Sequence, residues 1–273
     1  MNDSTAHIAI KKVNAMGIAA ADDILAAEEP LEIRLNYGPA DKRIQKSISV
    51  TMRTPGNDTE LAVGFLYTEG IIKNYEQVKG AFMVPDNIVQ VVLKENIPLD
   101  LSKLERNFYT TSSCGVCGKS SIESIKTVCE IGDSNDSLQV SSQVIYKLPE
   151  TLRQHQQVFA STGGLHASAI FDTSGHLILT REDVGRHNAL DKLIGKVLEI
   201  NMLPLDNCVL LLSGRASFEL IQKAAMAGIK IVAAVGAPSS LAAQTANEFG
   251  MTLIGFLRDE RFNIYCGEKR IRL

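Results

Sequence analysis

The sequence predicts an α/β protein of three layers with a mixed sheet, preceded by a smaller strand-rich part. After residue 143, apolar strand-like runs alternate with helical patterns and are joined by short connections, which is typical of a largely parallel sheet covered by helices. Before residue 140, short alternating segments and turn residues indicate mainly strands. With 273 residues, the chain is long enough to bury a sizeable core.

The first 140 residues divide into two regions. Residues 1–25 show little pattern, and we expect a loosely ordered lead-in there. The strand-rich subdomain, residues 26–140, is expected to hold strands at 31–35 and 44–52, a helix at 61–68 and a hairpin over 82–93. It ends in a loop at 107–118 that contains two cysteines, followed by a short helix near 120–128.

Residues 141–273 form the predicted α/β domain. Its helices are expected at 142–159, 188–200, 217–227 and 239–249, and its strands at 166–172, 177–182, 208–212, 229–235, 252–257 and 262–265. The first two strands are joined by Thr173-Ser174-Gly175 and therefore form a hairpin, which makes the sheet mixed.

Charge and hydropathy exclude several classes of protein. The net charge of −3 provides no global attraction to nucleic acid or to anionic lipid. The most apolar stretches are far shorter than the roughly 20 residues that span a bilayer, and the N-terminus lacks the pattern of a signal peptide. We expect no membrane association, no nucleic-acid partner and a cytoplasmic location.

The strongest local signal is the segment Cys114-Gly115-Val116-Cys117-Gly118. Two thiols at this spacing are able to relay sulfur, form a disulfide or share a metal, and a thiolate is the reactive form in each case. A zinc site needs about four ligands, and neither a second such pair nor a deaminase-type His-x-Glu is present. A thioredoxin-like redox role and an ordinary turn with two incidental cysteines are the remaining alternatives.

Four turns carry residues suited to holding an anion. They place glycines, serines and cations at strand ends and helix starts, where backbone N–H groups are free. Each is also open to a simpler interpretation as a capped helix, a tight turn or an internal ion-pair network. The candidate residues are Thr162, Gly163, Gly164, His166, Arg181, Asp183, Arg186, His187, Arg215, Phe256, Leu257, Arg258, Asp259, Glu260 and Arg261.

Taken together, these segments resemble the FdhD family, the sulfurtransferases needed for formate dehydrogenase activity. The matching pieces run in order from Glu28-Glu29-Pro30-Leu31, through 51–56 and 61–70, to the cysteine loop 111–118. Residues 162–167, 181–191, 213–223 and 255–265 complete the set, so the resemblance covers most of the chain after residue 25.

The resemblance implies a cytidine-deaminase-like domain without zinc ligands and a homodimer. It implies an enzyme that accepts persulfide sulfur from a cysteine desulfurase and passes it to molybdenum bis(molybdopterin guanine dinucleotide), the cofactor of formate dehydrogenase. The cofactor is cargo, and no permanent metal is expected. Cys114 would carry the persulfide with Cys117 as its partner, and residues 256–261 would contact the guanine nucleotide. A non-enzymatic cofactor chaperone is the alternative.

Overall fold

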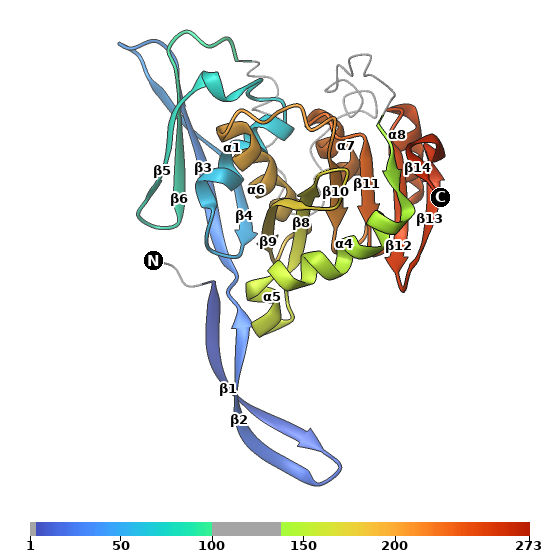
Figure 1. Ribbon diagram of the computed structural model, residues 1–273. Helices are drawn as coiled ribbons and strands as arrows, with labels where there is room; N and C mark the ends of the chain where they lie inside the picture. The colour runs from blue at the N-terminus through green and yellow to red at the C-terminus, as the bar shows by residue number, and fades with distance from the viewer. Residues whose placement is uncertain (1–3, 100–137) are drawn as a thin grey trace.

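The computed structural model describes residues 4–99 and 138–273 and is built around two main sheets (Figure 1). The larger, six-stranded sheet has the order β13-β12-β11-β10-β8-β9. Its strands are β8 (His166–Phe171), β9 (Leu177–Asp183), β10 (Val209–Leu212), β11 (Ile231–Ala234), β12 (Thr252–Arg258) and β13 (Arg261–Cys266). Strands β10, β11 and β12 are parallel, whereas β8, β9 and β13 join as antiparallel neighbours. The predicted mixed α/β sheet is confirmed.

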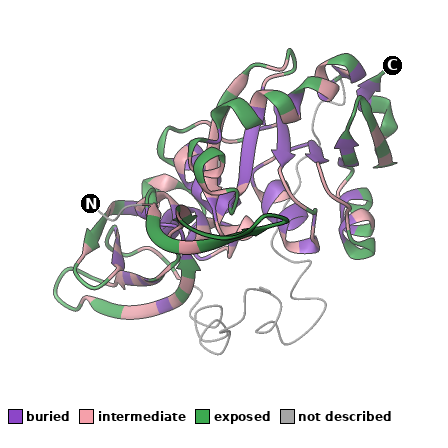
Figure 2. Ribbon diagram, turned by 90° about the horizontal axis from the view of Figure 1, so that it is seen from below, coloured by how far each residue is buried: buried purple, intermediate pink, exposed green. Residues whose placement is uncertain are grey.

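Helices cover both faces of this sheet because its strands are apolar on both sides. Val209 and Leu211 of β10 face a core that includes α4 (Ser142–His155). Leu210 and Leu212 face the opposite core, which includes α6 (Arg186–Glu199), α7 (Phe218–Met226) and α8 (Ser240–Glu248). Figure 2 shows these central strands coloured as buried, between helices with exposed outer surfaces.

The smaller sheet has the order β4-β3-β6-β5 and belongs to the N-terminal part of the chain. It consists of β3 (Glu29–Tyr37), β4 (Ile44–Arg53), β5 (Val78–Val84) and β6 (Ile88–Leu93), with helix α1 (Asp58–Thr68) between β4 and β5. Its buried side chains share one core cluster with α1, α6 and α7. The strand-rich part and the α/β part are therefore joined through a common apolar interior.

Helices α1 and α6 cross at very short range. A Cβ atom on Gly64 would overlap the carbonyl oxygen of Asp191, and a Cβ atom on Gly195 would overlap that of Glu60. Next to this crossing, the buried Lys223 of α7 donates to both oxygens of Asp191 at 2.8 and 2.9 Å. Glycine and a buried ion pair thus bring three helices together.

Three segments differ from the sequence-based prediction. Residues expected to form a loosely ordered lead-in instead form a hairpin of β1 (Thr5–Asn14) and β2 (Gly17–Ala26). Its side chains are mostly exposed on both faces, so it lacks the alternation that marks a half-buried strand. The helix predicted over 142–159 is broken at Gln156 into α4 and α5 (Gln157–Thr162). The helix predicted from 188 begins at Arg186.

The remaining elements are short. β7 (Val140–Ser141) pairs in parallel with β14 (Ile271–Arg272), and single 3-10 turns occupy Tyr75–Gln77 and Glu268–Arg270. Among the described residues, no helix has both the length and the apolar character required to cross a bilayer.

Candidate functional site

Four of the predicted segments meet at one edge of the six-stranded sheet. β9, β10, β11 and β12 all end there, and β8 begins there, because His166 pairs with Asp183 and Ser168 pairs with Leu212. Backbone bonds continue the edge beyond the strands, since Val235 donates to Leu212 and Phe256 donates to Gly236. Helices α6 and α7 start at this carboxyl edge, which is where open α/β sheets place ligands.

Positive charge gathers at this edge around His166. Its ring lies against Gly214, where an added Cβ would come within 3.0 Å of Nδ1. Burial, followed by the charges of Arg186, His187 and Arg215, lowers the pKa of His166, and Asp183 opposes them. These cations therefore act on a common space, beside the N-termini of α6 and α7, where an anion is stabilised.

Arg186 has a buried donor that no described residue satisfies. Its Nε atom is inaccessible to solvent and has no hydrogen-bond partner, as is also true of the hydroxyl oxygen of Ser168. Buried polar atoms in folded proteins normally have partners, and an unmet one requires an explanation. An anionic or polar ligand at the carboxyl edge would supply an acceptor for Arg186.

His187 links the starts of α6 and α7. Its Nε2 lies 3.2 Å from the hydroxyl of Ser217 and 3.8 Å from Oε2 of Glu219. The nearby His187 is the largest of the influences that lower the pKa of Glu219 to about 2, so Glu219 is ionised at neutral pH. A Ser-His-acid triad needs the acid on the other ring nitrogen; since both contacts here share Nε2, this group orients the two helices and is no hydrolase triad.

Two predicted ligands turn out to be internal. Arg181 makes a two-pronged ion pair with Glu60 of α1, at 2.6 and 2.9 Å. Asp183 is wholly buried, lies 2.7 Å from the ammonium of Lys192 and accepts the backbone N–H of Gly185 at 2.8 Å. Both side chains hold the β9–α6 turn in place, which is the ion-pair alternative that the sequence left open.

The glycine turn lies just before β8. Thr162 ends α5 and donates to the carbonyl of Val158 at 2.8 Å, and Gly163 adopts φ 67°. Gly163 and Gly164 are exposed, so their backbone is accessible two residues from His166.

The last predicted segment is the β12–β13 hairpin. Phe256 has φ 54° and is 38% exposed, whereas Leu257 is wholly buried in the core beneath α4. Asp259 and Glu260, both with positive φ, form the turn between the exposed Arg258 and Arg261. The ring of Phe256 and the guanidinium groups of Arg258 and Arg261 are therefore exposed to solvent. The side chain of Leu257 is buried and is not available to a ligand.

The predicted sulfur-carrying residues Cys114 and Cys117, and the short helix expected near 120–128, lie outside the described residues. Cys208 and Cys266 are buried, and burial raises the pKa of both thiols, so neither is a reactive thiolate. Within residues 4–99 and 138–273, no group of three or more metal-binding side chains is found.

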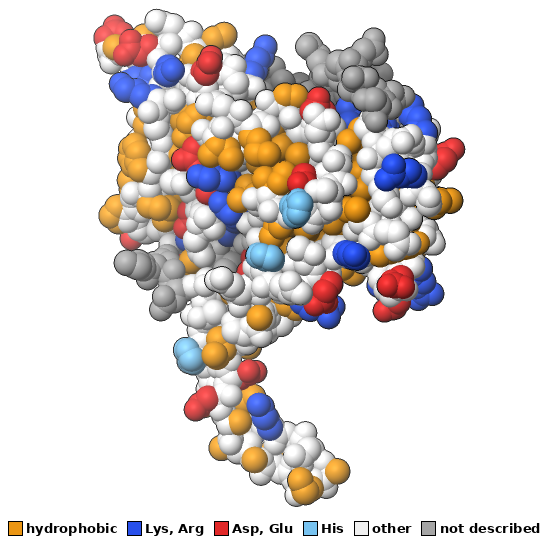
Figure 3. All heavy atoms as spheres, viewed as in Figure 1, with side chains coloured by type: hydrophobic (Ala, Val, Ile, Leu, Met, Phe, Trp, Pro, Cys, Tyr) orange, Lys and Arg blue, Asp and Glu red, His pale blue; other side chains and the backbone are white. Residues whose placement is uncertain are grey.

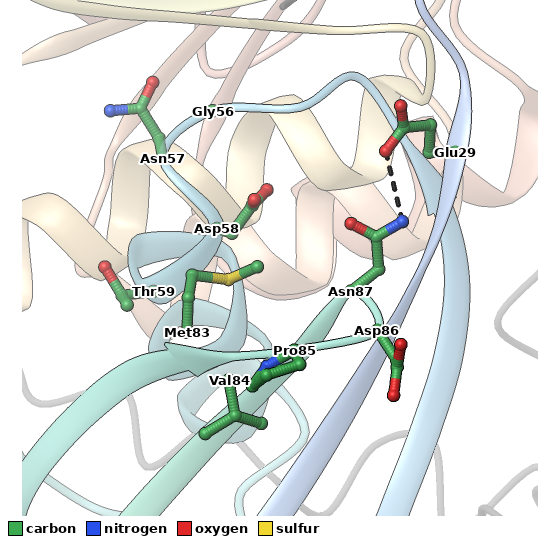
Figure 4. A pocket seen from close by; sticks show the side chains of 10 residues that line it. All are labelled: Glu29, Gly56, Asn57, Asp58, Thr59, Met83, Val84, Pro85, Asp86 and Asn87. Atoms are coloured by element: carbon green, nitrogen blue, oxygen red, sulfur yellow. Dashed lines mark hydrogen bonds between the residues drawn. The ribbon is translucent and has the colours of Figure 1, made fainter. Parts of the chain in front are cut away.

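A cavity of about 860 Å³ lies elsewhere, between the start of α1 and the β5–β6 turn (Figure 4). Its wall includes the carboxylates of Glu29, Asp58 and Asp86 and none of the predicted site residues. The buried Arg53 already pairs with Asp58 at 2.8 Å. Such an acidic wall does not suit a polyanionic ligand.

Sequence reasoning missed several residues at the carboxyl edge. Glu219 lies in the first turn of α7, and Ser168 follows His166 by two positions on the same face of β8. Ser217 was expected only as the cap of the helix, because a serine before a helix is a cap candidate. Lys192, which forms an ion pair with Asp183, could not be identified as part of the site from the sequence, because its burial depends on tertiary packing.

The family model for the FdhD/NarQ family matches residues 26–272. The chain belongs to the FdhD/NarQ family. A sulfur carrier protein FdhD of Streptomyces avermitilis is 47% identical over 266 residues, covering 94% of this chain and 92% of the relative. The protein of the same description from Mycobacterium tuberculosis is 44% identical over 285 residues, covering 99% of this chain and all of the relative.

A solved structure shows the same fold. It is a crystal structure from Desulfotalea psychrophila described as that of a formate dehydrogenase accessory protein, with a TM-score of 0.78 and 23% identity over 99% of this chain. Together, the FdhD/NarQ family assignment and this architecture confirm the resemblance seen in the sequence.

Proposed function

We propose that this FdhD/NarQ family member is a sulfurtransferase that matures formate dehydrogenase. It accepts persulfide sulfur from a cysteine desulfurase and transfers it to the molybdenum bis(molybdopterin guanine dinucleotide) cofactor. The observation that carries this proposal is the 47% and 44% sequence identity, over nearly the whole chain, to two proteins described as sulfur carriers. The Cys114–Cys117 pair supplies the chemistry that such a carrier requires.

The two cysteines divide the reaction between them. The Cys114 thiolate attacks the outer sulfur of the donor persulfide, the donor cysteine leaves as a thiolate, and Cys114 becomes a persulfide. The Cys117 thiolate then attacks the inner sulfur of Cys114, which forms the Cys114–Cys117 disulfide and releases hydrosulfide to the molybdenum centre. The pair thereby provides both electrons that reduce the carried sulfur to sulfide, and a cellular dithiol resets it.

The carboxyl edge is the proposed site for the cofactor as cargo. Its phosphates fit the N-termini of α6 and α7, with Arg186, His166 and Arg215 around them. Phe256 and the exposed arginines of the β12–β13 turn suit the guanine nucleotide, because rings and guanidinium groups stack on bases. The unpaired Nε of Arg186 supports this assignment.

The proposed partners follow from the reaction. They are a cysteine desulfurase as donor and formate dehydrogenase as recipient, in the cytoplasm, with the carrier as a homodimer of cytidine-deaminase-like domains. A resident metal is not part of the proposal.

Intact mass spectrometry tests the carrier step. After incubation with a cysteine desulfurase and cysteine, the wild type should gain a mass of about one sulfur atom that a thiol reductant removes. The gain should disappear with Cys114→Ala, whereas Cys117→Ala should retain it, because Cys117 acts only in release. Absence of the gain in the wild type, with the desulfurase shown to be active, would favour the cofactor chaperone.

A further inference from the structure

The β10–α7 turn and the β11–α8 turn run side by side at the carboxyl edge. Gly236 donates its N–H to the carbonyl of Gly214 at 2.9 Å, and Ala216 donates to the carbonyl of Ala237 at 3.2 Å. These backbone bonds continue the pairing of β10 with β11 past the ends of the two strands. The turns are therefore held in one register, with Gly214 next to Gly236.

The side chain of Arg215 lies against Gly236. A Cβ atom added to Gly236 would come within 3.0 Å of Cγ of Arg215, and equally close to the backbone of Gly214 and Arg215. Gly236 does not have the positive φ that favours glycine, so position 236 requires space rather than backbone freedom. The stem of Arg215 thus occupies the place where any other residue at 236 would put its own side chain.

Arg215 lies between the two ends of the proposed cofactor site. In the order of the sheet, β10 and β11 separate His166, which begins β8, from Phe256 of β12. Burial lowers the pKa of His166 most, and the charge of Arg215 is one of three nearby cations that add to this effect. On the other side, Phe256 donates its N–H to the carbonyl of Gly236 at 3.1 Å.

We propose that Gly236 is a positioning residue for Arg215, which in turn holds the phosphate group of a nucleotide that is nearest the nucleoside. The inference rests on the proposed cofactor site at the carboxyl edge. Because position 236 has no side chain, the stem of Arg215 follows the β11–α8 turn and keeps the guanidinium over the strand ends. A phosphate bound there accepts hydrogen bonds from its fork of N–H groups.

The placement of this arginine matters because little else holds it. Arg215 is exposed, and no ion pair is found for it among the residues that the structure describes. On the face shown in Figure 3, Lys and Arg side chains lie among Asp and Glu side chains, so the wider surface does not supply a uniform positive field. A stem that is already restrained loses less conformational entropy when a ligand binds.

Calorimetry with guanosine diphosphate and with guanosine tests the role of Gly236. Gly236→Ala and Arg215→Ala should each weaken guanosine diphosphate binding about tenfold, and both should leave guanosine binding unchanged, because guanosine has no phosphate. The double variant should bind guanosine diphosphate as Arg215→Ala does, since no arginine is left for the added methyl group to displace.

Gly80→Ala is the matched control. It adds the same methyl group at a position where the new Cβ meets nothing within 4 Å, and it should bind both ligands as the wild type does. Additive losses in the double variant, or equal weakening of guanosine and guanosine diphosphate by Gly236→Ala, would indicate a general distortion of the edge and overturn the proposal.

Wild-type affinity for guanosine diphosphate in either single variant would also overturn it. Arg215→Ala leaves both glycines in place, so its result decides the matter if Gly236→Ala does not fold. A wild type that binds no guanosine diphosphate would reject the cofactor site of the proposed function, and this inference with it. Binding by the wild type together with unchanged binding by Gly236→Ala would reject the inference alone.

Discussion

At the scale of single residues, the carboxyl edge combines carboxylates that have internal partners with cations that face a common space. Asp183 is paired with Lys192, and Glu219 with His187. For Arg186 and Arg215, no ion pair is found among the described residues. Local charge thus offsets the negative net charge of the chain at the edge where we propose that the polyanionic cofactor binds.

His166 should make nucleotide binding depend on pH. Burial and its cationic neighbours lower the pKa of His166 in the free protein; a bound phosphate raises it again, so binding takes up a proton. Affinity for guanosine diphosphate, measured by calorimetry, should therefore increase as the pH falls from 8 to 6, by at most about tenfold per pH unit. His166→Gln should flatten this dependence.

His176→Gln is the matched control for this measurement. His176 lies in the exposed turn between β8 and β9, with its side chain 83% exposed, and its replacement should leave the pH dependence intact. An unchanged slope in His166→Gln would remove His166 from the site.

The site could be predicted from the sequence only where a residue type and its place in a turn agree. His166, Arg186, His187 and Arg215 were identified in this way, and the structure brings them together. Arg181 and Asp183 are also charged residues next to the same turn, yet they form ion pairs with Glu60 and Lys192 and are not available to a ligand. Glu60 lies 121 residues from Arg181, in α1, and Lys192 lies inside α6. The local sequence around Arg181 and Asp183 therefore does not reveal either ion pair.

At the scale of elements, the close crossing of α1 and α6 determines the position of the first turn of α6. Gly64 and Gly195 allow the two backbones to touch, and Thr54, after β4, donates its N–H to Asp183 at 3.1 Å. The N-terminal part of the chain thereby supports the turn that presents Arg186 and His187.

Gly64→Ala should destabilise the protein, although alanine normally favours a helix by about 1 kcal/mol over glycine. The added Cβ overlaps a backbone carbonyl, which cannot move without separating α1 from α6, and we expect a loss of about 1–3 kcal/mol or more. Urea unfolding followed by circular dichroism measures this change.

Gly80→Ala provides the comparison, since a Cβ at Gly80 of β5 meets nothing within 4 Å and should change stability by no more than about 0.5 kcal/mol. Equal stability of Gly64→Ala and wild type would contradict the tight crossing.

Most elements were predictable because their apolar periodicity reflects burial on one or two sides. The strands of the six-stranded sheet and the helices α6 to α8 follow this pattern. The β1–β2 hairpin was missed because its exposed residues have no core to impose a pattern. The break at Gln156 was missed because the polar run 153–157 contains neither glycine nor proline to mark the end of a helix.

At the scale of the whole molecule, one apolar core joins the N-terminal sheet to the six-stranded sheet. The segment with Cys114 and Cys117 connects these two parts in sequence, between residues 99 and 138. In the proposed mechanism, the sheet edge binds the cofactor and the connecting segment supplies the cysteines.

Transfer of sulfur from the purified, persulfide-loaded protein to formate dehydrogenase tests the central claim most directly. The loaded protein, freed of desulfurase and added to formate dehydrogenase that contains unsulfurated cofactor, should restore formate oxidation in proportion to the persulfide supplied. Cys114→Ala, treated identically, should restore none. Equal activation by the unloaded protein or by Cys114→Ala would contradict sulfur transfer and identify the protein as a cofactor chaperone.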